Sequence, residues 1–182
     1  DDADLLRQEG NDVEAKRFER WIAALRPRCD RIVSVQGSST DAAVPNAVDI
    51  PPLVRTPASP PRLLLVGNFG YGPNAVGARW LLESVMPLVR DRRPDVALDV
   101  VGPTSEQFGA DGRGIVDDLH PLYGAATLAV VPILTGSGTR IKALEAWAHG
   151  VPVVSTSIGL DGLGAIDGTD ALIADDPAQF AT

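Results

Sequence analysis

Residues 128–155 read LAVVPILTGSGTRIKALEAWAHGVPVVS and contain two apolar runs joined by a glycine-rich turn and a helical pattern. The run Leu128–Val131 predicts a strand, and Thr139–His149 predicts a helix that Gly150 closes. A second apolar run, Val151–Ser155, follows at once. Strands without polar alternation on either side of a helix are typical of a parallel sheet that helices cover on both faces.

The same alternation continues in both directions along the chain. Apolar runs at Leu63–Val66, Leu98–Val101 and Leu172–Ala174 predict three more strands, and helical patterns fall at Ala75–Val89 and Asp118–Tyr123. This order predicts an α/β fold with a doubly wound, Rossmann-like and mostly parallel sheet. Ligands of such folds bind beyond the carboxyl ends of the strands, so the loops at those ends are expected to carry the site.

The helical patterns also predict which side chains face the core. On the 75–89 helix these are Trp80, Leu81, Val85 and Leu88. On the 139–149 helix a stripe is expected from Ile141, Leu144 and Ala148, with Glu145 at its margin. Trp21 and Trp147 also lie on apolar helix faces and are predicted core residues.

The first 61 residues differ in character. Apolar residues recur at helical spacing from Asp12, and Arg31–Val35 is typical of a short strand. Gln36–Pro61 is rich in Gly, Ser and Pro, which is typical of a semi-extended linker. Because the chain starts at Asp1 without a methionine and stops at Thr182 inside a loop or helix start, we interpret it as a piece of a longer protein.

Composition excludes several classes of partner. The net charge of −8 over 182 residues argues against nucleic acid and against anionic lipid, both of which need a basic face. Cys29 is the single cysteine, which excludes an intrachain disulfide and a Cys-rich zinc site and favours a cytoplasmic, reducing compartment. No apolar run is long enough to form a transmembrane segment.

The glycine-rich turn before the 139–149 helix predicts an anion site. Gly136 and Gly138 allow a tight turn, and Thr139 opens a helix whose first amides are unpaired. Arg140 and Lys142 lie in the first turn, where an exposed cation costs about 0.3–1 kcal/mol against the helix dipole. A bound diphosphate would reverse that cost.

Glu145 can be interpreted in two ways. Its carboxylate can accept hydrogen bonds from two adjacent hydroxyls, as on a ribose. It can equally form a surface pair with Lys142 three residues earlier, worth about 0.2–0.5 kcal/mol. The residues alone leave both interpretations open.

From Arg62 onward the chain resembles the C-terminal domain of family-four (group 1) retaining glycosyltransferases, which have the GT-B architecture. The resemblance rests on four segments in the family's order, of which the third is the most specific. They are LLLVGNFGYGPNAVGARWLLESVMPLVR, GIVDDLHPLY, VVPILTGSGTRIKALEAWAHGVPVVSTSIGLDGL and LIADDPAQFA. The resemblance implies a remnant of the N-terminal acceptor domain at 1–44, an interdomain linker at 45–61 and a truncated nucleotide-sugar-binding donor domain at 62–182.

The resemblance also implies the site residues. The diphosphate would lie against Gly136, Ser137, Gly138, Thr139, Arg140 and Lys142, with the two cations stabilising the leaving group. Glu145 would hold the ribose hydroxyls, Ile115, Val116 and Asp117 would lie near the base, and the 67–72 turn, with Gly67 and Asn68, would close over the diphosphate or the acceptor. The implied reaction is transfer of a sugar, with retention, from a UDP- or GDP-linked donor to a hydroxyl of an unknown acceptor, without cofactor or metal.

Three features depart from the family pattern. Many members have two glutamates with seven residues between them, and here Ser137 stands at the first position and Glu145 at the second. The stretch between Gly102 and Gly114 is too short for the strand and helix expected there. The acceptor domain is almost wholly absent, so transfer by this chain alone is not expected, and a peripheral membrane contact through that domain stays open.

Other functions fit the sequence less well. The turn GNFGYG has the spacing G-x-x-G-x-G, which departs from the dinucleotide fingerprint, and Asp99 lies inside its strand and not at its end. A nucleotide-sugar epimerase with the GT-B fold and a domain that binds a nucleotide sugar without turning it over remain alternatives. The acidic pairs Asp117–Asp118 and Asp175–Asp176 are predicted to be helix caps or turns, His149 to suit a helix end, and His120 to be at the surface.

Overall fold

The structure is a computed structural model that divides into two compact units. It describes residues 7, 10, 12–28, 33–34, 42–43, 45–52, 54–136 and 138–182. The first unit comprises Asp1–Ala47 together with Thr135–Thr139, and the second comprises Val48–Leu134 together with Arg140–Thr182. The two units are described separately.

The first unit contains a helix and a pair of very short strands. Helix α2 (Asp12–Leu25) continues into the 3-10 turn η1 (Arg26–Arg28), and β1 (Val33–Ser34) pairs in parallel with β2 (Ala42–Ala43). The side chains of Phe18 and Ile22 lie outside the described residues. Trp21 is 57% exposed, so its prediction as a core residue is wrong. Apolar spacing identifies one face of a helix but does not establish that the face is covered.

The second unit is built on a five-stranded parallel sheet. Its strands are β3 (Arg62–Val66), β4 (Ala97–Val101), β5 (Leu128–Val131), β6 (Val153–Ser155) and β7 (Leu172–Ile173). Their order is β4-β3-β5-β6-β7, and every pairing is parallel. The predicted doubly wound α/β fold is confirmed. The order reverses between β3 and β5, which is the topological switch point where ligands of such sheets bind.

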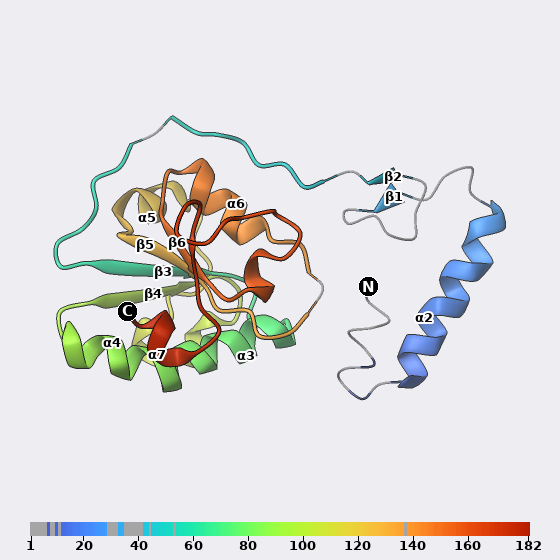
Figure 1. The fold of residues 1–182 in the computed structure, drawn as a ribbon, viewed down its shortest axis with the longest axis horizontal. Helices are drawn as coiled ribbons and strands as arrows, with labels where there is room; N and C mark the ends of the chain where they lie inside the picture. The colour runs from blue at the N-terminus through green and yellow to red at the C-terminus, as the bar shows by residue number, and fades with distance from the viewer. Residues whose placement is uncertain are drawn as a thin grey trace. The chain divides into compact units, whose positions relative to one another are not determined.

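Helices cover both faces of this sheet (Figure 1). One face carries α3 (Gly72–Trp80), the π-helical turn η2 (Leu81–Val85), α4 (Met86–Arg92) and α7 (Pro177–Phe180). The other face carries α5 (His120–Ala125) and α6 (Ile141–Ala148). Leu63 and Leu65 of β3 pack into the first core and Leu64 into the second, as strand alternation requires. Short 3-10 turns, η3 (Ser105–Asp111) and η4 (Ile158–Leu160), lie in loops.

The helix predicted at 75–89 is a longer segment with one extra residue in its middle. The amide of Met86 bonds to the carbonyl of Leu81, five residues back, and the following Pro87 has no amide to restore the regular pattern. Leu81 and Val85 are buried as predicted, but Leu88 is 39% exposed, so its inward prediction is wrong. The extra residue rotates the later turns, and Met86 takes the buried position instead.

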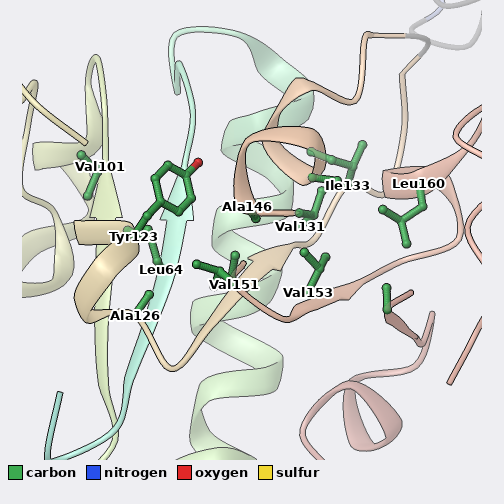
Figure 2. Close-up of a cluster of buried hydrophobic side chains, with 13 residues drawn as sticks. Leu64, Val101, Tyr123, Ala126, Val131, Ile133, Ala146, Val151, Val153 and Leu160 are labelled. Atoms are coloured by element: carbon green, nitrogen blue, oxygen red, sulfur yellow. The ribbon is translucent and has the colours of Figure 1, made fainter. Parts of the chain in front are cut away.

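Helix α6 also turns a different face to the core than predicted. Its buried residues are Ala143, Ala146 and Ala148, whereas Ile141 is 38% exposed. Small side chains let the helix lie close to the sheet, and Figure 2 shows Ala146 in the same cluster as Val131 and Val153. The predicted stripe is thus wrong except for Ala148.

The other two tryptophans are half-buried. Trp80 meets Phe180 edge to face at 5.2 Å between ring centroids, and Trp147 packs against the core around α6. Trp147 Nε1 donates to the carbonyl of Asp170 at 3.0 Å. Both therefore pack against the core as predicted, each with part of its ring exposed.

Residues 48–52 and 54–58, which fall within the predicted linker, belong to the second unit. Arg55 donates from its two terminal nitrogens to the carbonyls of Gly150 and Ala126, each at 2.6 Å. The amides of Thr56 and Ala58 bond to carbonyls at the end of α5 at 3.0 and 2.8 Å. Because Arg55 reaches carbonyls at the ends of both α5 and α6, it caps these helices where the dipole favours a cation.

Asp99 is a buried acid in β4 with two arginine partners. It is 3% exposed, and Arg62 Nη1 lies 2.8 Å from both of its carboxylate oxygens. Arg113 Nε also donates to this carboxylate. The position of Asp99 inside the strand therefore has a structural explanation, an ion pair that joins β3, β4 and the loop after η3.

Candidate nucleotide-sugar site

Two helices on opposite faces of the sheet meet over the carboxyl end of β3. Lys142 Nζ, from α6, donates to Asn74 Oδ1, from α3, at 2.9 Å. Asn74 Nδ2 donates in turn to the carbonyl of Asn68 at 2.8 Å. A Cβ atom on Gly67 would lie 3.2 Å from Lys142 Cε, so Gly67 lets the lysine side chain pass close to the backbone. The structure thus brings Gly67, Asn68 and Lys142 together, as predicted.

Asn74 is a site residue that the sequence analysis missed. It is 9% exposed and lies in the first turn of α3, directly after the 67–72 turn. The signal was a single amide side chain among the small and apolar residues of GPNAVGA. Buried amides need hydrogen-bond partners, and here the partners are the two predicted elements on either side.

Arg140 and Lys142 place two cations at the start of α6. Arg140 is the N-cap residue, is 7% exposed, and its Nη2 lies 4.0 Å from Asp161 Oδ2. Burial lowers the pKa of Arg140, while Asp161 and Tyr71 oppose that effect. Burial lowers the pKa of Lys142 as well, the neighbouring Arg140 lowers it further, and Glu145 opposes both. Two partly desolvated cations at a helix N-terminus favour a bound anion.

A pocket of about 280 Å³ is lined by residues of α5 and α6 and of the segment before α5. Its lining is formed by Val116, Asp117, Asp118, Leu119, His120, Tyr123, Glu145 and His149. Val116, Asp117 and Glu145 were predicted to contact one nucleoside, and the fold brings them together in this pocket although Glu145 lies 28 residues after Asp117 in the sequence. The pocket is small for a ligand site, near the lower end of the usual range.

Glu145 contacts a residue that the sequence analysis did not single out. The hydroxyl of Tyr123 donates to Glu145 Oε2 at 3.3 Å. The Tyr123 ring stacks on His149 at 4.4 Å between centroids, and Figure 2 shows this ring in the core cluster beside Leu64 and Ala126. Burial raises the pKa of Tyr123 far above its ordinary value, and the Glu145 charge and hydrogen bond raise it further.

The predicted diphosphate loop belongs to the other unit. Gly136, Gly138 and Thr139 fall in Thr135–Thr139, which is described with the first unit alone, and Ser137 lies outside the described residues. Gly136 has a φ of 111°, a conformation that favours glycine, as expected of the turn. The predicted contacts of this loop with a diphosphate stay predictions.

The acidic pairs and histidines have local partners. Asp118 accepts from the amide of His120 at 2.9 Å, and Asp176 caps α7 by accepting from the amides of Ala178 and Gln179. Asp175 accepts from Ser157. His120 is exposed as predicted, and the ring of His149 contacts a helix carbonyl, that of Glu145. The pairs therefore serve as caps and turn contacts, as predicted.

Metal clusters and membrane-spanning helices are absent from the described residues. Across the ranges given above, no cluster of three or more His, Cys, Asp or Glu side chains could hold a metal ion. Within those ranges, too, every helix is too short or too polar to cross a bilayer.

Residues 60–182 match the family described as "Glycosyl transferases group 1", which is more than half of the chain. The chain belongs to the group 1 glycosyltransferases. The predicted relationship is thereby confirmed, and the matched range begins two residues before β3 and runs to the end of the chain.

The chain is also similar to one curated protein in sequence and to solved structures in fold. A Klebsiella pneumoniae protein described as "Uncharacterized 44.6 kDa protein in cps region" is 33% identical over 135 residues, which cover 65% of this chain and 35% of that protein. The crystal structure of TarM superposes with a TM-score of 0.65 at 14% identity, over 90% of this chain and 41% of that one. The GtfA/B complex gives 0.51 at 19% identity, over 73% and 29%. The chain thus spans about a third of the length of its curated relative.

Proposed function

We propose that this chain is the donor-binding domain of a retaining glycosyltransferase, which moves a sugar from a nucleoside diphosphate to a hydroxyl of an acceptor. One observation carries the proposal. The carboxylate of Glu145 and the ammonium of Lys142 both project from α6, three residues apart, one lining the pocket of Val116 and Asp117 and the other lying over Gly67. A ribose needs a hydrogen-bond acceptor for its hydroxyls, and the diphosphate next to it needs a cation. Glu145 and Lys142 supply these two groups.

The charges support a role in leaving-group departure. When the bond between the anomeric carbon and the diphosphate oxygen breaks, the electron pair stays on the diphosphate, and the acceptor oxygen forms the new bond and gives up its proton. Lys142 and Arg140 would stabilise the charge that develops on the diphosphate. Their burial strengthens that effect, because an interaction with an anion is stronger where water is excluded.

The finer parts of the proposal rest on the family resemblance. These are retention, a hexosyl donor linked to UDP or GDP, and the contacts of Gly136, Ser137, Gly138 and Thr139 with the diphosphate. The cytoplasm is the proposed compartment, on the basis of the single Cys29. The acceptor would be bound by a part of the protein outside this donor domain.

Calorimetric titration with UDP, GDP and their sugar nucleotides tests donor binding. One nucleotide is expected to bind, and Glu145→Ala and Arg140→Ala are each expected to weaken it about tenfold or more, as for hydrogen bonds to charged groups. Glu83→Ala and Arg79→Ala are matched controls, because both side chains are exposed on the opposite helical layer. Absence of binding at millimolar nucleotide, or equal losses in the controls, would overturn the proposal.

Product analysis separates transfer from the two alternatives. A transferase releases the nucleoside diphosphate from its sugar and keeps the anomeric configuration in the product. An epimerase would convert the sugar nucleotide to an isomer without acceptor, and a binding domain would leave it intact when supplied with the rest of the enzyme. Either of these two results would contradict the proposed reaction.

A further inference from the structure

Tyr123 is a buried tyrosine whose hydroxyl meets a functional carboxylate. The residue is 1% exposed, yet it lines the same pocket as Glu145. Its hydroxyl hydrogen is directed to Glu145 Oε2 at 3.3 Å. A carboxylate only accepts, so when Glu145 is ionised the phenol is the donor, and a strongly raised pKa keeps that hydrogen in place across the physiological range.

The ring of Tyr123 also contacts an imidazole. His149 stacks on it with 19° between the ring planes, and His149 Nδ1 lies 2.7 Å from the carbonyl oxygen of Glu145. Because a carbonyl only accepts, Nδ1 of His149 carries a hydrogen. In the neutral ring Nε2 is then an acceptor, and His120 Nδ1, 2.7 Å away, donates to it. The tyrosine thus has one available position between the core and the imidazole.

We propose that Tyr123 is a positioning residue, which orients the carboxylate of Glu145 so that the site reads the two adjacent hydroxyls of a ribose. The inference rests on the proposed function, since it concerns the same pocket. The tyrosine hydrogen occupies one lone pair of Oε2 and fixes the rotation of the carboxylate. The remaining lone pairs stay available for a pair of neighbouring donors. The site therefore selects ribonucleotides over deoxyribonucleotides, and the selection depends on a residue that the substrate does not need to touch.

A purely structural tyrosine would behave differently. Loss of its hydroxyl would then weaken all ligands equally, through stability or pocket shape. A positioning role predicts a loss confined to ligands that carry both hydroxyls. The ratio of ribonucleotide to 2′-deoxyribonucleotide affinity therefore distinguishes the two roles, because a general loss cancels in it.

The test is calorimetry of the chain with UDP and GDP and with their 2′-deoxy forms, in the parent and in Tyr123→Phe. Phenylalanine keeps the ring, the stack on His149 and the core packing. The variant is expected to bind the ribonucleotide about 3- to 10-fold more weakly, the usual size of one hydrogen bond, and the deoxynucleotide within about twofold of the parent. In a Glu145→Ala background the same substitution should change neither affinity, because the carboxylate that it orients is gone.

The outcomes are distinguishable. If the parent chain binds no nucleotide, the proposed function fails and takes this inference with it. If the parent binds nucleotide but Tyr123→Phe weakens ribonucleotide and deoxyribonucleotide binding equally, or weakens neither, donor binding stands and the positioning role is wrong. A thermal unfolding curve of each variant checks that the comparison is between folded proteins, and the double variant gives the same decision if Tyr123→Phe lowers stability.

Discussion

Lys142 and Asn74 join helices from opposite faces of the sheet across the end of β3, with 2.9 Å between Nζ and Oδ1. The contact ties the start of α6 to the start of α3 at the topological switch point. It also holds the ammonium group of Lys142 in a partly desolvated place. The pKa of Lys142 is lowered mainly by burial and also by the charge of Arg140. Such an arrangement has a cost in the free protein, and the cost can be measured.

Lys142→Met is expected to stabilise the protein while it weakens nucleotide binding. The pKa of Lys142 in the folded state lies below the ordinary value of 10.5, so between the two values the unfolded state holds more protons and stability rises with pH. Below that window the full penalty applies, and removal of the ammonium relieves it. At neutral pH we expect a higher Tm and, for a nucleoside diphosphate, about tenfold or more weaker binding.

Lys16→Met provides the matched control, because the chain has two lysines and Lys16 lies on the exposed surface of α2. Differential scanning fluorimetry and calorimetry give both quantities. Nucleotide affinity of the parent should also fall as pH rises through the lowered pKa of Lys142, and therefore at a pH below 10.5. A Tm of Lys142→Met below that of the parent at neutral pH would show that the Asn74 contact outweighs the desolvation.

Asp161→Asn is expected to strengthen nucleotide binding. The Asp161 carboxylate lies 4.0 Å from Arg140 Nη2 and opposes the positive field that a diphosphate would meet. Its side chain is 73% exposed, so the gain should be modest, about two- to fivefold at low salt, and should shrink as salt screens it. Asp91→Asn, on the exposed side of α4, is the control. Weaker binding in Asp161→Asn would instead mean that this acid positions Arg140.

Gly77→Ala is expected to destabilise the second unit by about 1–3 kcal/mol or more, as an overpacked substitution does. A Cβ atom at this position would lie 2.0 Å from the carbonyl oxygen of Pro132, so α3 would have to move away from the loop after β5. At Gly72, in the same helix, a Cβ meets nothing within 4 Å. Urea unfolding should therefore show a loss for Gly77→Ala, and for Gly72→Ala no loss or a gain of about 0.4–1 kcal/mol.

Asp99→Asn is expected to cost about 1–3 kcal/mol of unfolding free energy, because this buried group would lose its charged hydrogen bonds to Arg62 and Arg113, whose side chains are 29% and 45% exposed. The exposed pair of Arg93 and Asp95 offers the contrast, and Asp95→Asn should change stability little. Urea denaturation of both variants makes the comparison. Similar midpoints for the two would contradict a structural role for Asp99.

The sheet could be predicted from sequence because each strand lies in a mostly apolar run that lacks regular polar alternation. Each of the five predicted runs contains a strand, and parallel order follows from the helices between them. The loops after Val66 and Val131 could likewise be named as places for a site, since both follow carboxyl ends of the same sheet. These predictions needed only the local hydrophobic pattern and the rule that a helix between two strands joins them in parallel.

Side-chain burial was harder to predict, since it depends on tertiary packing. The extra residue between Leu81 and Met86 shifts every later position, which moved Leu88 outward, and no periodicity shows such a shift in advance. On α6 the buried face is formed by alanines. They are less hydrophobic than Ile141, but their small size lets the helix lie close to the sheet. Tyr123 and Asn74 could not be paired with Glu145 and Lys142, because each pair joins different helices.

Arg55 gives the segment before β3 a mechanical meaning. Its guanidinium grips the ends of α5 and α6 through two 2.6 Å hydrogen bonds, and those helices carry Tyr123 and Glu145. Tension on the chain before Val48 would act on Arg55 first, and through it on the two helices that line the pocket, before it acted on β3. A truncation that starts the chain at Arg62 would keep all five strands but would remove Arg55 and its hydrogen bonds to both helices.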